Sequence, residues 1–265
     1  MSHTTRKKHK NSTLKLAVLG SLSFIIVMVA IGLARKIYHI HQAKQVVDIA
    51  TKTGNQVTKI SKQIKRKDIT FYIVRHAQTD ANVKGLYAGS GTDAHLTTMG
   101  RYQAKGAGKD LQNIKFAHIY TSELTRTQDT AKLILSHNKS TSKKVPHTIL
   151  RDLNDLDWGK VEGLSPDEIS KKYPNFFKDY DLGSVDDLTF KPKYEIESTA
   201  HAVMRFDRAF DHILYEAKDG DTILVVGHSS LAWWFQKHLP ESGITSIQNA
   251  EVIKVRYHKG KMSVL

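Results

Sequence analysis

The pattern of apolar positions divides the chain into three unequal parts. The first is a run of 19 uncharged, mainly apolar residues, 16–34. A basic stretch, 35–67, follows, in which Val57, Ile60 and Ile64 recur at offsets of three and four, a spacing that indicates a helix. One or two helices are therefore expected there. A solvated, partly disordered tether is the alternative, because short isolated helices are weak in water.

Beyond this stretch, short β-branched runs alternate with amphipathic stretches of helical length. Strands are expected at 69–74, 118–121, 148–150, 222–226, 251–257 and 262–265. Longer helices are expected at 98–111, 126–135, 198–217 and 231–239. Ser165-Pro166 with Glu168 indicates one more helix start, through a capping box and a first-turn proline. This alternation predicts a three-layer α/β/α domain over 68–265, with a mainly parallel central sheet and a site at the C-terminal ends of its strands.

The first of these strands ends on an arginine and a histidine. Residues 69–80 read ITFYIVRHAQTD, so the apolar run delivers Arg75 and His76 to the C-terminal edge of the sheet. An imidazole beside a fixed cation can attack a bound phosphate. Seen alone, the pair is equally compatible with a solvated loop.

Two later segments supply matching chemistry. The run Ser122–Ala131 follows a short strand and opens a helix with Arg126 near its start, where a guanidinium and the helix N-terminus can both bind an anion. The strand at 222–226 ends on Gly227-His228-Ser229, which brings a second histidine to a strand end. Each residue alone has an ordinary structural explanation, but their combination favours a phosphoryl site.

Together these motifs resemble the histidine phosphatase superfamily, in its phosphoglycerate-mutase-like branch. The Arg-His-Gly-x-Thr motif of that family is matched by Arg75–Thr79, with Asn82 following. The second motif, Ser-x-Leu-x-Arg-x-x-x-Thr-Ala, is matched by Ser122–Ala131, and the Gly-His motif by Gly227-His228. The resemblance covers roughly residues 68–265.

The resemblance implies a mechanism through a phosphohistidine. His76 would attack phosphorus, and the resemblance implies phosphate binding by Arg75, Asn82, Arg126, His228 and Ser229. Asp155 would protonate the leaving oxygen and then activate the water that hydrolyses the intermediate. His228 counts among the catalytic residues. The resemblance implies no metal and no cofactor.

Two positions depart from the family pattern. Ala77 replaces the usual glycine, which is harmless if the backbone there avoids positive φ. Asp155 stands where glutamate is common, and its side chain is one methylene shorter. Activity then requires the loop to compensate, and a catalytically inactive phosphate-binding module is one of the alternatives.

The remaining alternatives concern the reaction. The segment 165–197, with aromatic residues that include Tyr173, Phe176, Phe177, Tyr180 and Tyr194, is expected to form a lid, unless these aromatics are local core. It lacks the cationic cluster that a mutase needs for a second phosphate. A phosphomonoesterase acting on a small phosphorylated substrate is therefore favoured, and a phosphoglycerate-mutase-type phosphotransferase is the alternative. A serine hydrolase is disfavoured because Gly227–Leu231 lacks the second glycine of a nucleophile elbow.

The apolar run 16–34 is expected to be a single transmembrane helix. Nineteen residues at about 1.5 Å each span roughly the bilayer core. The flanks are basic on both sides, and the run exceeds the usual length of a signal-peptide core, so an uncleaved anchor is favoured over a cleaved signal. Residues 1–15 form a basic N-terminal tail, and the weak excess of positive charge there places it inside. The expected location is the cell membrane, single-pass, with the catalytic domain outside the cytoplasm.

Charge and composition support this division. Residues 1–67 hold 14 Lys and Arg and one acid, Asp48, a net charge of +13. The whole chain has +14, which leaves +1 for residues 68–265. The basic excess therefore fits the headgroups of a membrane better than nucleic acid, which is not an expected partner. The absence of cysteine is compatible with an oxidising compartment. The sequence does not give an oligomeric state.

Overall fold

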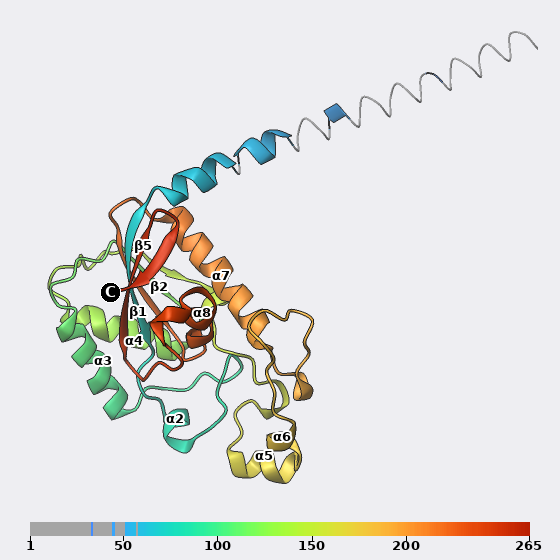
Figure 1. Ribbon diagram of the computed structural model, residues 1–265. Coiled ribbons are helices and arrows are strands. Elements are labelled where there is room, and N and C mark those ends of the chain that lie inside the picture. The colour runs from blue at the N-terminus through green and yellow to red at the C-terminus, as the bar shows by residue number, and fades with distance from the viewer. Residues whose placement is uncertain (1–32, 34–43, 46–50, 57) are drawn as a thin grey trace, which may run out of the picture. The chain divides into compact units, whose positions relative to one another are not determined.

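A computed structural model describes Leu33 and residues 44–45, 51–56 and 58–265 (Figure 1). Backbone contacts divide the chain into two compact units, Met1–Ser61 and Lys62–Leu265. In the first unit, residues 51–56 and 58–61 are helical, and the second unit begins with helical residues 62–65. Within the described part of the chain, no helix combines the length and the apolar character needed to cross a membrane. The predicted span, 16–34, lies outside the described residues except for Leu33.

A six-stranded mixed sheet forms the centre of the second unit. Its strand order is β3-β2-β4-β1-β5-β6. The four parallel strands are β1 (Asp68–Arg75), β2 (His118–Thr121), β3 (His147–Ile149) and β4 (Thr222–Gly227). The two antiparallel strands at one edge are β5 (Val252–His258) and β6 (Lys261–Val264). The predicted α/β fold with a mainly parallel sheet is confirmed.

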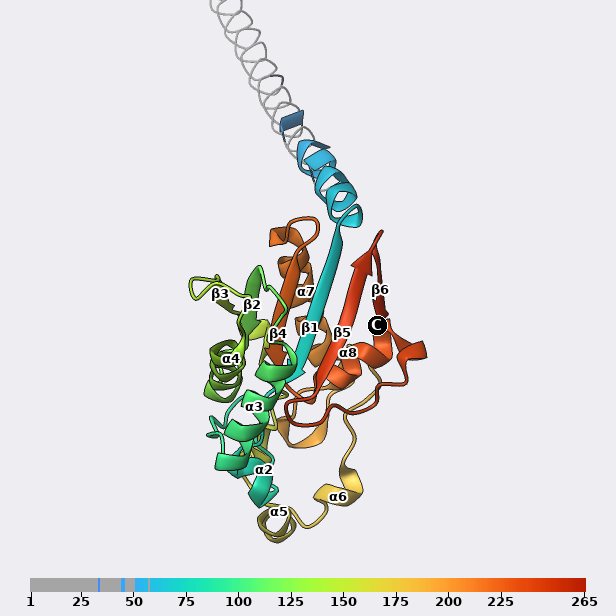
Figure 2. The ribbon, with the colours of Figure 1, turned by 90° about the vertical axis from the view of Figure 1, so that its left-hand side faces the viewer.

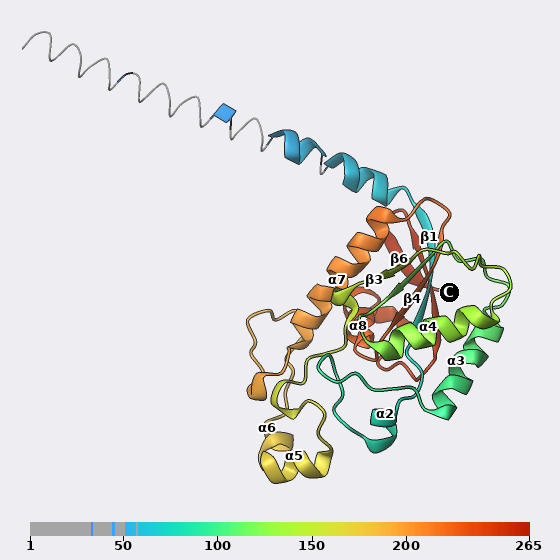
Figure 3. The ribbon, with the colours of Figure 1, turned by 180° about the vertical axis from the view of Figure 1, so that it is seen from behind.

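Helices cover both faces of the sheet (Figures 1 and 3). One face carries α3 (Thr98–Asp110) and α4 (Thr125–His137), and the other carries α7 (Thr199–Glu216) and α8 (Leu231–His238). Successive side chains of β1 point to opposite faces of the sheet, which explains why the core has two layers. Phe71 and Ile73 join the cluster with α7 and α8, whereas Tyr72 and Val74 join the cluster with α3 and α4. All six strand predictions and all four long-helix predictions fall on these elements within about two residues.

Shorter elements occupy the end of the sheet where β1 finishes (Figure 2). They are the helices α2 (Asp80–Lys84), α5 (Pro166–Lys172) and α6 (Phe176–Asp179). The 3₁₀ turns of the second unit are η1 (Arg151–Leu153), η2 (Gly159–Val161), η3 (Lys193–Glu195) and η4 (Pro240–Ser242). The expected capping box of α5 is present, with Ser165 and Glu168 exchanging hydrogen bonds. Helix α2 was not predicted. A second capping box, from Thr79 and Asn82, starts it.

Of the aromatic residues in 165–197, Phe176 belongs to the core, whereas Phe177 and Tyr180 are 49% and 42% exposed. Phe176 is fully buried and its ring contacts those of Tyr87, Phe177, Tyr180 and Tyr194 at 5.1 to 5.8 Å between centroids. The cavity that holds His76 is lined by no residue of this segment. The lid expectation is therefore not supported. The segment instead contacts two residues that line the cavity, Tyr87 through Phe176 and Trp158 through Tyr180.

Candidate active site

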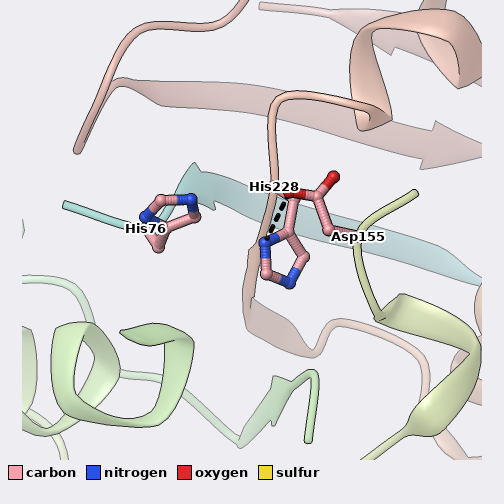
Figure 4. Close-up of side chains that lie close together, drawn as sticks. All are labelled: His76, Asp155 and His228. Carbon is pink, nitrogen blue, oxygen red and sulfur yellow. Dashed lines mark ion pairs between the residues drawn. The ribbon is translucent and has the colours of Figure 1, made fainter. Parts of the chain in front are cut away.

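The two histidines come together because their strands are neighbours. β1 pairs in parallel with β4, and the last paired residues are Arg75 and Gly227. His76 and His228 are therefore the next residue on each strand, at the same edge of the sheet. Their ring centroids lie 5.2 Å apart. Asp155 comes from a third segment and lies beside His228 (Figure 4).

His76 has a defined tautomer. Its Nδ1 lies 2.8 Å from the carbonyl oxygen of Ala77, an atom that can only accept a hydrogen bond. Nδ1 must therefore carry the proton, which leaves the lone pair on Nε2. The backbone N–H of His76 donates to the carbonyl of Gly227 at 2.8 Å and fixes the residue to β4. The sequence predicted a nucleophilic imidazole here, and the structure assigns the free nitrogen.

Burial keeps this imidazole neutral. His76 is 2% exposed, and burial, followed by the repulsion that its protonated form would meet from a protonated His228 and from Arg126, lowers its pKa well below the usual value. The hydrogen bond to Ala77 acts in the opposite direction but is outweighed. A neutral ring has a lone pair to donate, so the electrostatics of the site favour the nucleophilic form.

Arg75 presents an unpaired donor to the site. Its Nη1 donates to the carbonyl of Ile247 at 2.8 Å, whereas its Nε is buried and has no partner among the described residues. A buried N–H without an acceptor is costly. An oxygen of a bound anion would satisfy it.

Arg126 lies at the start of α4 and is 1% exposed. Nη1 donates to the carbonyl of Thr92 at 2.7 Å, and Nη2 donates to the carbonyl of Gly89 at 3.0 Å. Nη2 also lies 3.4 Å from Oδ2 of Asp155. The guanidinium thus holds the loop 88–92 and places a permanent positive charge beside the acid.

Both oxygens of Asp155 have defined neighbours. Oδ1 accepts hydrogen bonds from the hydroxyl of Ser230 at 2.6 Å and from the N–H of Leu156 at 3.0 Å. Oδ2 lies 3.4 Å from Arg126 Nη2 and 3.4 Å from Nδ1 of His228 (Figure 4). One oxygen therefore orients the carboxyl group, and the other faces the reacting residues.

His228 is fully buried between Asp155 and Ser122. Its Nε2 lies 2.8 Å from the hydroxyl of Ser122, and its Nδ1 is buried without a hydrogen-bond partner among the described residues. Burial, followed by the charges of Arg126 and Arg75, lowers its pKa well below the usual value. Two buried nitrogens of the site, this Nδ1 and Arg75 Nε, thus have no hydrogen-bond partner in the part of the chain that the structure describes.

This arrangement agrees with comparisons to known proteins. The family model described as "Histidine phosphatase superfamily (branch 1)" matches residues 71–265, most of the chain. The chain belongs to the histidine phosphatase superfamily.

Relatives within the superfamily include mutases and phosphatases. A 2,3-bisphosphoglycerate-dependent phosphoglycerate mutase from Cytophaga hutchinsonii is 27% identical over 188 residues, covering 68% of this chain and 81% of the relative. The fructose-2,6-bisphosphatase TIGAR from Xenopus tropicalis is 35% identical over 97 residues, covering 37% of this chain and 35% of the relative. The match to the mutase from Beijerinckia indica spans only about half of that relative, 51%.

Solved structures share the fold. A phosphoglycerate mutase from Bacillus anthracis superposes with a TM-score of 0.64 at 24% identity, covering 76% of this chain and 93% of the other. A mycobacterial glucosyl-3-phosphoglycerate phosphatase complexed with VO3 gives 0.60 at 20% identity, covering 74% and 96%.

The site residues of this histidine phosphatase share one cavity of about 470 Å³. The predicted residues that line it are Arg75, His76, Asn82, Arg126, Asp155 and Ser229. Only His228 is absent from the lining, and it contacts Asp155 from below the surface. The structure therefore brings all seven predicted residues together, and their individual roles remain predictions.

Asn82 has a structural task besides any contact with phosphate. Its Oδ1 accepts from the N–H of Thr79 at 3.0 Å and from Nδ2 of Asn249 at 3.3 Å. Only its amide N–H groups are then available to an anion. Ala77, the first departure from the family pattern, does not have positive φ and is buried, so the added methyl is accommodated as expected.

Several residues of the site were not predicted. Ser122 and Ser230 bind His228 and Asp155, and Asn249 donates to the carbonyl of His76 at 3.0 Å. Ser122 opens the second motif and Ser230 follows the Gly-His motif, so both positions were visible in the sequence without an assigned partner. Asn249 lies in a connection without periodicity, and no sequence signal marks it.

The donor set bears on what the site can bind. His76, Asp155 and His228 each offer one ligand atom, and these atoms lie within 4.8 Å of one another, a grouping that suits a metal ion. Arg75 and Arg126 add two positive charges to the same cavity. These cations repel a metal ion and attract an anion, and the unpartnered N–H of Arg75 also favours an anion.

Proposed function

We propose that this histidine phosphatase is a phosphomonoesterase that forms a phosphohistidine on His76. The observation that carries the proposal is the bare Nε2 lone pair of a buried, neutral His76, in a cavity with Arg75 and Arg126. Charge in phosphoryl transfer is spread over the equatorial oxygens, so the role of the protein is placement and charge stabilisation. Arg75 and Arg126 supply the positive charge, and His228, which lies beside Asp155, contributes to placement.

The reaction proceeds in two steps. In the first, Nε2 of His76 bonds to phosphorus, the bond to the ester oxygen breaks, and Asp155 gives its proton to that oxygen. In the second, Asp155 takes a proton from water while the water oxygen attacks phosphorus. The bond between nitrogen and phosphorus breaks, so phosphate leaves and His76 is neutral again.

A trapping experiment tests this mechanism. The protein is mixed with a ³²P-labelled monoester and quenched in alkali, in which phosphohistidine survives. We expect a transient labelled protein that His76→Ala abolishes together with phosphate release. Turnover of p-nitrophenyl phosphate without any labelled intermediate would contradict the mechanism. No turnover at any mildly acidic pH would indicate the inactive binding module.

A mutase is the second candidate, favoured by the Cytophaga relative. The cations that line the cavity are Arg75 and Arg126, both in the phosphate site, and we see no further cation there for a second acidic group. Incubation with 3-phosphoglycerate, with and without 2,3-bisphosphoglycerate, separates the candidates. A phosphatase releases inorganic phosphate, whereas a mutase requires the bisphosphate and retains phosphate in the product.

We further propose that residues 16–34 anchor the enzyme in the cell membrane, with the catalytic domain outside the cytoplasm. The support is the run of 19 uncharged residues between basic flanks. Protease added to intact cells should remove the domain. Protection from protease would reverse the orientation, and extraction of the protein by alkaline carbonate would exclude an integral anchor.

A further inference from the structure

The cavity has a part that the phosphate site does not use. The charged or titrating residues of the cavity that act in the proposed reaction are Arg75, His76, Arg126 and Asp155. The other lining residues that matter here are three aromatic ones, Tyr87, Trp158 and Trp233, and three neutral polar ones, Thr245, Ser246 and Gln248. Apart from these four residues, the residues that line the cavity are therefore uncharged.

Two of the aromatic residues form a wall that is fixed before substrate binds. Tyr87 meets Trp158 edge to face at 4.7 Å, and it meets the buried ring of Phe176 at 5.8 Å. Glu162 accepts hydrogen bonds from the N–H of Trp158 at 3.0 Å and of Gly89 at 2.6 Å. A methyl group on Gly89 would lie 1.9 Å from the carbonyl of Leu156, so only glycine permits this approach. Burial raises the pKa of Tyr87, which keeps its hydroxyl uncharged.

The polar residues lie on a connection that is tied to the nucleophile. The carbonyl of Ile247 accepts from Arg75 at 2.8 Å, and Asn249 donates to the carbonyl of His76 at 3.0 Å. Thr245, Ser246 and Gln248 are therefore held near the end of β1. They offer hydroxyl and amide groups, which bind hydroxyls well but do not compensate a buried charge.

We infer that the physiological substrate is the phosphate monoester of an uncharged hydroxyl compound with an apolar ring. The inference rests on the proposed phosphatase function. An apolar ring gains binding free energy when it covers the aromatic wall. A carboxylate or a second phosphate there would lose its hydration and find no cation to compensate the loss. A cavity of about 470 Å³ is of the size that takes small organic molecules.

A matched pair of substrates tests the inference on the full-length chain. 4-(Hydroxymethyl)phenyl phosphate and 4-carboxyphenyl phosphate share one ring and have similar leaving groups, but only the second carries a charge. We expect kcat/KM to be at least about tenfold higher for the first, since a partly desolvated, unpaired carboxylate costs more than 1.4 kcal/mol. Equal values, or a preference for the carboxylate, would overturn the inference and leave the phosphatase intact. If neither substrate releases phosphate, the proposed function fails and the inference fails with it.

Two variants locate the effect. Ser246→Lys adds a cation to the uncharged part of the cavity, and we expect it to raise kcat/KM for the carboxylate substrate about three- to fivefold relative to kcat/KM for the hydroxymethyl substrate. Ser140→Lys, on an exposed loop, is the control and should change kcat/KM for neither substrate. Trp233→Ala should raise KM for the ring-bearing substrate and leave that for glycerol 2-phosphate unchanged. An equal loss of kcat on both substrates would mean that Trp233 is structural, and it would remove this residue from the recognition site.

Discussion

The hydroxyl of Ser230 should decide how well Asp155 works as an acid. Asp155 is one methylene shorter than the glutamate usual in the family, so its carboxyl group has less reach and its orientation matters more. Ser230, 4% exposed, donates to Oδ1 at 2.6 Å, and the N–H of Leu156 donates to the same oxygen at 3.0 Å. These two bonds turn Oδ2 toward Arg126 and His228. Removing the hydroxyl by Ser230→Ala leaves the carboxyl group with a single tether.

The size of the effect follows from the bond that is lost. Asp155 is protonated when it acts as the acid, and a hydrogen bond between neutral groups is worth about 0.5 to 1.5 kcal/mol. Because Ser230 and Asp155 are both buried, we take the upper end, about 1.5 kcal/mol, which corresponds to roughly a tenfold fall in rate. The fall should appear only where protonation of the leaving oxygen limits the reaction.

The assay therefore compares two leaving groups. For 2-phenylethyl phosphate, an alkyl ester, kcat/KM of Ser230→Ala should fall about tenfold. For p-nitrophenyl phosphate, whose leaving group departs with little protonation, it should fall less than about twofold. Ser136→Ala, on the exposed side of α4, is the control and should change neither. An equal loss on both esters, or no loss on either, would refute the positioning role of Ser230.

Three further predictions follow from the same structure. Asp155→Asn should slow alkyl phosphates by at least about a hundredfold and aryl phosphates far less, which a leaving-group series measures; equal losses would remove Asp155 as the acid. The folded-state pKa of His76 is lowered, so the unfolded chain binds more protons below about pH 6.5 and stability falls as pH falls. Urea unfolding at pH 7.5 and pH 5.5 measures this. The unfolding free energy of the unaltered protein should fall by about 1.4 kcal/mol more between these pH values than that of His76→Gln, and equal falls would show that His76 titrates normally. Lys67→Met should lower the unfolding free energy by about 1.5 kcal/mol in the same assay. The reason is that Lys67 Nζ donates to the carbonyls of Leu214, Tyr215 and Ala217, at 2.5 to 3.0 Å, near the end of α7. An unchanged urea midpoint would contradict this.

Local patterns were sufficient for the six strands and the four long helices of the catalytic domain. The β-branched run before Arg75 predicted β1, and the capping box at Ser165 predicted the start of α5, because both signals depend only on neighbouring residues. The prediction of a lid over 165–197 is not supported, because it depends on contacts between residues that are distant in the sequence. An aromatic residue such as Phe176 has the same local pattern whether it covers a cavity or packs beneath its wall, and only contacts with distant residues such as Tyr87 distinguish the two.

The sequence by itself determined the kind of site: two strands that end on histidines, two arginines and one acid in an order that the family shares. The tertiary structure alone decided how they act. The free nitrogen of His76, the tether of Asp155 by Ser230 and the uncharged part of the cavity each depend on atoms from segments that the fold brings together. Hydrogen-bond direction and desolvation are set by surroundings within a few ångströms, and the order of residues along a chain does not specify those surroundings.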